Sequence, residues 1–173
     1  MAQFPGPSVS VVSAAPRAIA AVRAQLRISR VPGMFAQYLN QVYAASRAGA
    51  VQLDGQNVFV YRGGTGADDE VDIEFGVGVK APFPPSGPVR YSELPVGEAA
   101  TATHWGDYAR LGEAHGAVIA WCRTHHRPLA GPRWEVYGHW TDDPAQLRTD
   151  VYYLLEPSAE SAGGGGRRSP IVG

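Results

Sequence analysis

The sequence predicts an α+β fold in which a β-α-β-β module occurs twice about a pseudo-twofold axis, giving an antiparallel sheet, two main helices and a central ligand cleft. Three observations lead to this prediction: a weak internal repeat, one amphipathic helical pattern in each half, and a pair of strand-like segments after each helix. In the repeat, residues of the first half meet similar residues of the second half at one constant offset, that between Gly55 and Gly131. The other pairs at this offset are Phe35 and Leu111, Val42 and Val118, Arg47 and Arg123, Val60 and Val136, and Tyr61 and Tyr137.

The first half is expected to span about residues 8–80. Segments 8–14 and 17–28 have the alternation of strands, although alanines blur the second. A helix is expected from about Val31, with Ser29 as its capping residue, Pro32 in its first turn and Gly49 at its end. Its apolar stripe consists of Val31, Phe35, Tyr38, Leu39 and Val42. Segments 57–63 and 70–79 then form a hairpin.

The second half, about residues 88–156, repeats this order after a proline-rich crossing over residues 80–88. Segments 88–94 and 98–105 are expected strands, and Asp107 caps a helix that runs to about His126. Leu111, Val118, Ile119 and Cys122 form its apolar stripe, and segments 133–140 and 149–155 form the second hairpin. One domain is therefore expected over 8–156, with an N-terminal extension over 1–7 and a disordered Gly/Ser-rich tail over 157–173.

Composition excludes several functional classes. The chain of 173 residues has a net charge of −1 and no basic face, so direct nucleic-acid binding is not expected. Its single cysteine excludes an intramolecular disulfide and a cysteine zinc site, and its five histidines lack metal-ligand spacing. Neither a metal nor a cofactor is therefore expected. No apolar run approaches the ~18 residues of a membrane span and no basic signal-peptide start is present, so we expect a cytoplasmic protein that does not bind membranes.

Glu135 is a charged residue inside a strand-like segment rich in aromatic and branched residues. Because side chains of a strand alternate between faces, Trp134 and Val136 share one face, while Glu135 and Tyr137 share the other. In the first half, Val58 and Val60 likewise oppose Phe59 and Tyr61. We expect the valine face to pack on the helices and the aromatic face, with Glu135, to line a groove. The alternative is that Glu135 is a solvated residue on an open sheet face.

The segment from Gly131 to Pro157 resembles the end of GyrI-like domains, which are also the effector-binding domains of multidrug-responsive transcription regulators of the AraC and MerR types. The residues that carry the resemblance are Gly131, Pro132, Trp134, Glu135, Tyr137, Asp143, Pro144 and Thr149, and upstream His104, Gly106 and Tyr108. The resemblance covers about residues 8–156. It implies two strand-helix-strand-strand modules with a central cleft, in which a glutamate at the position of Glu135 contacts cationic, lipophilic ligands. The regulators carry a DNA-binding domain on the same chain, so this chain is expected to be a stand-alone member.

The resemblance and the residue types together predict binding of lipophilic, often cationic aromatic small molecules, for sensing or sequestration. The expected ligand-binding residues are Glu135, Tyr137, Phe59, Tyr61, Trp105, Tyr108, Tyr153, Met34 and Tyr38. One alternative is a hydrolase of cyclopropane-containing alkylating compounds, as in some GyrI-like proteins. In it Glu135 would be the general base, and Tyr137 or Tyr108 would donate a hydrogen bond to the substrate. A further alternative is a protein-interaction module, as in relatives that inhibit DNA gyrase; no protein partner is indicated by the sequence.

Overall fold

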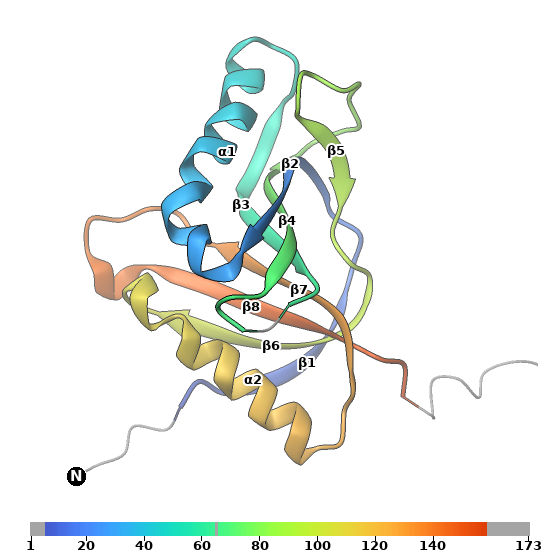
Figure 1. Cartoon of the computed structure of the whole chain (residues 1–173), viewed down its shortest axis with the longest axis vertical. Helices are drawn as coiled ribbons and strands as arrows, with labels where there is room; N and C mark the ends of the chain where they lie inside the picture. Colours follow the sequence, from blue (N-terminus) through green and yellow to red (C-terminus); the bar gives the residue numbers. More distant parts are fainter. Residues whose placement is uncertain (1–5, 65, 159–173) are drawn as a thin grey trace, which may run out of the picture.

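The computed structural model describes residues 6–64 and 66–158, which form one antiparallel sheet of eight strands and two main helices (Figure 1). The strands are β1 (Val9–Ala14), β2 (Ala18–Arg27), β3 (Leu53–Arg62), β4 (Glu70–Val79), β5 (Arg90–Glu93), β6 (Gly97–Trp105), β7 (Leu129–Tyr137) and β8 (Arg148–Leu155). The helices are α1 (Val31–Arg47) and α2 (Gly112–Thr124), and three short 3-10 turns are η1 (Ile28–Arg30), η2 (Tyr108–Arg110) and η3 (Pro144–Gln146). The predicted α+β fold is confirmed. The predicted tail from residue 159 onward lies outside the described residues.

The order of the strands in the sheet is symmetric about its centre. The order is β1-β6-β8-β7-β3-β4-β2-β5, so β3 and β7, the strands that follow the two helices, lie side by side in the middle. The two outer strands are exchanged between the halves: β1 pairs with β6, and β5 pairs with β2. Each half therefore contributes one edge strand to the sheet of the other half.

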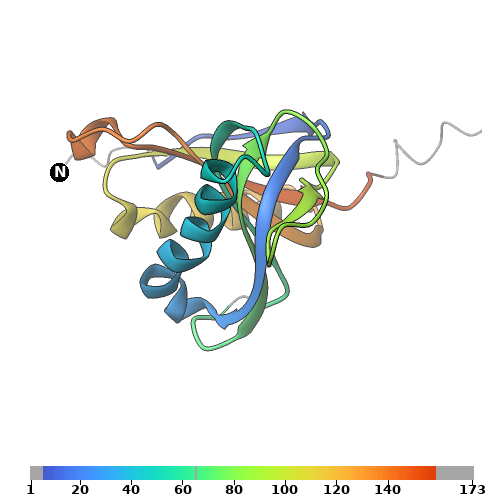
Figure 2. The same ribbon diagram turned by 90° about the horizontal axis from the view of Figure 1, so that it is seen from above.

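Both helices pack on the same face of the sheet (Figure 2). Helix α1 buries Leu39 and Val42 against aromatic and branched residues of β2, β3 and β4, among them Phe59 and Phe75. Helix α2 buries Val118 and Cys122 against β6 and β8. The two helical cores are separate clusters of buried residues.

The opposite face of the sheet has a core of its own, which corrects one prediction. Val58, Val60 and Trp134 are buried there with Ile19 of β2 and Ala99 of β6, and no helical residue belongs to this cluster. Since β2 and β6 are far apart in the strand order, the sheet curls so that its two ends approach each other on this side. The expectation that the valine face packs on the helices is therefore wrong. Alternation separates the two faces of a strand, but only the direction in which the sheet curls decides which face the helices cover.

The start of α1 also differs from the prediction. Ser29 does not cap the helix: it lies in η1, and the N-cap residue, Arg30, makes no side-chain hydrogen bond. The backbone N–H groups of Ile28 and Ser29 are satisfied by the carbonyl oxygens of Asp69 and Ala67 in the β3–β4 loop. Before α2, the carboxylate of Asp107 accepts a hydrogen bond from the backbone N–H of Ala109 and caps η2. It does not cap the long helix as predicted, because α2 begins at Gly112 and its N-cap residue, Leu111, makes no side-chain hydrogen bond.

Candidate ligand-binding cavity

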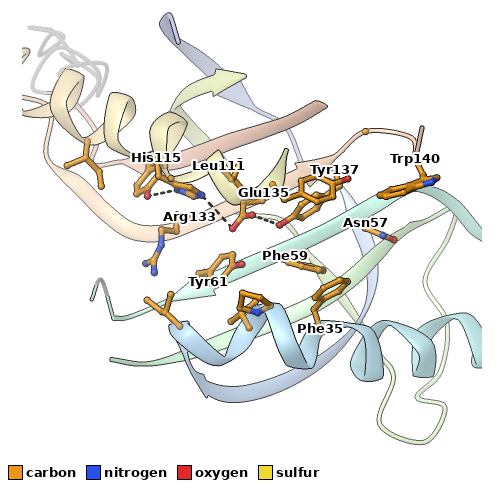
Figure 3. A pocket seen from close by; sticks show the side chains of 18 residues that line it. Phe35, Asn57, Phe59, Tyr61, Leu111, His115, Arg133, Glu135, Tyr137 and Trp140 are labelled. Atoms are coloured by element: carbon orange, nitrogen blue, oxygen red, sulfur yellow. Dashed lines mark hydrogen bonds and ion pairs between the residues drawn. The ribbon is translucent and has the colours of Figure 1, made fainter. Parts of the chain in front are cut away.

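A cavity of about 700 Å³ lies between α1 and α2, above the central strands β3 and β7 (Figure 3). Its volume is within the range of small-molecule sites, roughly 300–1,000 Å³. The floor is made of buried side chains of the two central strands and of β8, namely Phe59, Tyr61, Glu135 and Tyr153. Residues of both helices line this cavity, so the helix-covered face of the sheet stays open between α1 and α2.

Glu135 is at the centre of the floor, and its side chain is fixed by neighbours on both sides. The residue is 5% exposed. The hydroxyl of Tyr137 donates a hydrogen bond to Oε2, and Nε2 of His115 on α2 lies 3.6 Å from Oε1 (Figure 3). The other ring nitrogen of His115, Nδ1, is hydrogen-bonded to the hydroxyl of Tyr153 at 2.7 Å. A chain of polar contacts thus runs from Tyr153 through His115 and Glu135 to Tyr137.

Aromatic rings continue this floor toward α1. The ring centroids of Phe59 and Tyr137 are 4.9 Å apart, and those of Phe59 and Phe35 are 5.8 Å apart. Tyr108 meets Tyr137 edge to face at 5.6 Å. These rings are in contact with one another as well as with the cavity, so the wall is largely preformed.

The phenols that line the cavity are held in their neutral form. Burial, followed by the charge of Glu135, raises the pKa of Tyr61 and of Tyr137 well above the ordinary tyrosine value. Burial is also the main reason that the pKa of Tyr153 rises to about 12. At neutral pH these side chains are therefore hydrogen-bond donors.

Arg133 gives the lining a positive charge as well. Its guanidinium lies over the ring of Tyr61, 5.4 Å from the centroid, and Nη1 donates a hydrogen bond to the carbonyl oxygen of Gly63 at 3.2 Å. In Figure 3 it lies at one end of the cavity, and Trp140 lies at the opposite end. The lining consequently carries a positive group, Arg133, as well as the carboxyl group of Glu135.

The mouth of the cavity is apolar and solvent-accessible. Trp140 is 73% exposed, and Phe35 on α1 and Ile119 on α2 are each 37% exposed. All three belong to the lining. Exposed aromatic and aliphatic groups gathered at the entrance of a cavity are typical of a binding site for an apolar molecule.

Six of the predicted site residues lie together in this cavity: Phe59, Tyr61, Tyr108, Glu135, Tyr137 and Tyr153. The structure does not bring Met34, Tyr38 or Trp105 to it. Tyr38 stacks on Phe75 at 5.0 Å within the core beneath α1, and Met34 is part-buried on α1 outside the lining. Trp105 is 60% exposed at the end of β6, where the guanidinium of Arg148 covers its ring.

Sequence reasoning missed Arg133, His115, Trp140 and Phe35 as lining residues. The signal for Arg133 was present, because it alternates with Glu135 and must share its face of β7. His115 on α2 follows the N-cap residue Leu111 by four residues. Its side chain therefore lies on the same side of the helix as Leu111, the side that faces the cavity. Trp140 lies beyond β7 in an irregular segment, and no periodicity could place it.

Two further features bear on the chemistry of the site. Within residues 6–64 and 66–158, no group of three His, Cys, Asp or Glu side chains is close enough to hold a metal ion. No helix among the described residues is long and apolar enough to cross a bilayer.

The chain matches a known protein family in sequence and several solved structures in fold. Residues 7–156 match the model of a family described as GyrI-like small molecule binding domain. The crystal structure of the EcmrR C-terminal domain is similar with a TM-score of 0.73 and 17% identity, over 88% of this chain and 99% of that chain. In the EcmrR–DNA complex, the match spans 87% of this chain and 58% of that chain (TM-score 0.75, 15% identity).

Two more solved structures share the fold at lower identity. SAV2435 bound to tetraphenylphosphonium is similar with a TM-score of 0.58 and 8% identity, over 91% of this chain and 98% of that chain. A hydrolase from Listeria innocua is similar with a TM-score of 0.60 and 10% identity, over 88% of this chain and 94% of that chain. No curated protein matches the chain in sequence.

Proposed function

We propose, on the premise that this chain belongs to the family of GyrI-like small-molecule-binding domains, that its cavity binds lipophilic aromatic cations, for sensing or sequestration. In this proposal Glu135 is the counter-charge, and Phe59, Tyr61, Tyr108 and Tyr137 form the aromatic wall. The observation that carries the proposal is the burial of Glu135, which is 5% exposed on the floor of an apolar cavity.

A carboxylate in such a place is costly unless it is paired. Its partners among the described residues are the phenol hydroxyls of Tyr137 and Tyr61 and an imidazole nitrogen 3.6 Å away. A delocalised organic cation loses little hydration on entering the cavity, and it can meet both the carboxylate and the π faces of the rings. A small, strongly hydrated cation would lose more than it regains. The similarity to SAV2435, whose structure holds tetraphenylphosphonium, adds weight to this class of ligand.

Titration calorimetry with tetraphenylphosphonium and tetraphenylborate tests the proposal, because the two ions have nearly the same shape and opposite charge. We expect the wild-type protein to bind the cation and to reject the anion. Glu135→Gln is expected to weaken binding of the cation by about tenfold or more, as for loss of a charged partner. Glu98→Gln, which removes a carboxylate outside the cavity, is the matched control and should leave the affinity unchanged. Equal binding of both ions, or binding of neither, would refute the proposal.

A hydrolase is the second candidate, because the residues that it requires lie side by side. Glu135, Tyr137 and Tyr108 line the same cavity, and Tyr137 contacts both of the others. In this reading Glu135 accepts a proton from water, and the water oxygen attacks a cyclopropane carbon while a ring C–C bond breaks. The electron pair of that bond passes into the conjugated carbonyl, whose developing negative charge is stabilised by a hydrogen bond from a tyrosine hydroxyl. The resulting enolate takes up a proton and Glu135 returns to its carboxylate form, so the product is the substrate plus one water. Incubation with a cyclopropane-containing alkylator should give a product heavier by one water, and Glu135→Gln should abolish it. An unchanged substrate mass would exclude this reading and leave the binding proposal standing.

A further inference from the structure

Arg133 and Glu135 place opposite charges on the same face of β7. They are two residues apart, so their Cα atoms are separated by about 6–7 Å along the strand, and both side chains belong to the cavity lining. Among the described residues no ion pair joins them. Glu135 is turned toward Tyr137 and His115, and the guanidinium of Arg133 points away from it (Figure 3). The cavity floor thus presents a separated negative and positive charge.

The guanidinium of Arg133 has donors that the protein does not use. An arginine side chain carries five N–H donors, and in the described part of the chain Arg133 makes one hydrogen bond, to the carbonyl oxygen of Gly63. The ring of Tyr61 covers one of its faces and leaves its edges free for an acceptor. Its charge is felt inside the cavity, since it lowers the pKa of Tyr61 and of Tyr153 against the larger raising effect of burial.

We propose that the ligand class this cavity prefers is zwitterionic: an aromatic compound with a delocalised cation, placed beside Glu135, and a carboxylate bound by Arg133. This inference rests on the proposed function and narrows it. A ligand with only a positive charge would cover Arg133 without supplying a counter-ion, and the two like charges would repel each other. A carboxylate about one strand repeat away from the cation relieves both penalties, because a guanidinium can bind it through two parallel N–H···O bonds.

Rhodamine 110 and rhodamine 123 test the inference directly. They share one xanthylium cation; rhodamine 110 has a free carboxylate, and rhodamine 123 is its methyl ester. Fluorescence anisotropy of each dye gives its affinity for the wild-type protein, Arg133→Gln, Arg133→Lys and Arg148→Gln. Arg148 is the matched control, because it too lies over an aromatic ring, that of Trp105, but is outside the cavity.

We expect the acid to bind the wild-type protein at least as tightly as the ester. Arg133→Gln should lower the affinity for the acid about tenfold, as for loss of a charge-assisted hydrogen bond. It should leave the affinity for the ester unlowered or raise it, because the repulsion between Arg133 and the cation is removed. Arg133→Lys keeps the charge and should keep the acid at least as tight as the ester, so the test stands even if the glutamine variant does not fold. Arg148→Gln should change neither dye.

The opposite results are equally clear. Tighter binding of the ester by the wild-type protein, or an equal loss for both dyes in Arg133→Gln, would overturn the zwitterion inference while leaving cation binding intact. If neither dye binds, the proposed function fails, and the inference fails with it.

Discussion

Phe59 and Glu135 are direct partners in the pairing of β3 with β7, and their separation in sequence equals the offset that aligns the two halves. In a sheet that is symmetric about this strand pair, the pseudo-twofold axis passes between these two residues. The central position of the floor therefore holds an aromatic ring on one side of the axis and a carboxylate on the other. The carboxyl group of Glu135 therefore lies at the centre of the cavity floor, opposite the ring of Phe59.

Phe59 is expected to be needed for stability, whereas its neighbour Phe35 is not. Phe59 is buried and contacts the rings of Phe75 and Tyr137, so Phe59→Ala should lower the free energy of unfolding by about 3 kcal/mol. Phe35 is 37% exposed at the cavity mouth, and Phe35→Ala should cost less than about 1 kcal/mol. Urea denaturation followed by circular dichroism measures both. Similar losses for the two variants would show that the rim is packed as tightly as the floor.

Ligand binding is expected to quench the fluorescence of one tryptophan in particular. Trp140 lines the cavity mouth, while Trp105 has a similar exposure but lies outside the lining. Trp140→Phe should therefore remove most of the quenching caused by a bound rhodamine, and Trp105→Phe should remove little of it. The affinity itself is read separately from dye anisotropy. Quenching that persists in Trp140→Phe and disappears in Trp105→Phe would place the ligand beside Trp105, outside the cavity.

The hydrogen bond between His115 and Tyr153 should appear as a coupling free energy. His115→Leu leaves the hydroxyl of Tyr153, a residue only 6% exposed, without its imidazole partner, which should cost about 1–3 kcal/mol. Removing both groups in His115→Leu/Tyr153→Phe should cost about 1 kcal/mol less than the sum of the single changes. His139→Leu, at an exposed position after β7, should change stability by less than about 0.5 kcal/mol. Strict additivity of the two site variants would contradict the contact.

Stability is expected to fall at alkaline pH through the buried phenols. The pKa of Tyr153 is about 12 in the folded protein against an ordinary tyrosine value of 10.0, because burial disfavours its anion. The folded state then holds a proton that the unfolded state has lost. The resulting stability is fully present below about pH 10 and disappears as the pH rises toward 12, with a total near 3 kcal/mol.

The wild-type protein should therefore lose its advantage over Tyr153→Phe by about 1 kcal/mol between pH 10 and 11. Guanidinium denaturation at pH 9, 10 and 11 provides the measurement. A constant difference between the two proteins over this range would mean that Tyr153 ionises as readily in the folded state as in the unfolded chain.

Much of the architecture followed from local patterns. Alternation in β3, β4, β7 and β8, and the apolar stripes of α1 and α2, predicted these elements, since side-chain direction repeats every two residues in a strand and about every 3.6 in a helix. Ser29 was misassigned because a 3-10 turn, held by backbone contacts to the β3–β4 loop, leads directly into α1. Trp105 was expected in the aromatic wall, but it lies at the end of β6 outside the lining, whereas Tyr108 in the following turn belongs to it.

The sequence by itself determined that Arg133, Glu135 and Tyr137 share one face of a strand, because consecutive side chains of an extended backbone must point to opposite sides. Only the tertiary structure decided that this face lies on the same side of the sheet as the helices. It also decided that a cavity remains above this face, between the two helices. That outcome depends on the exchange of β1 and β5 between the halves and on the curl of the whole sheet, which bury the valine face against itself. These are contacts between distant segments, and no periodicity within a single segment records them.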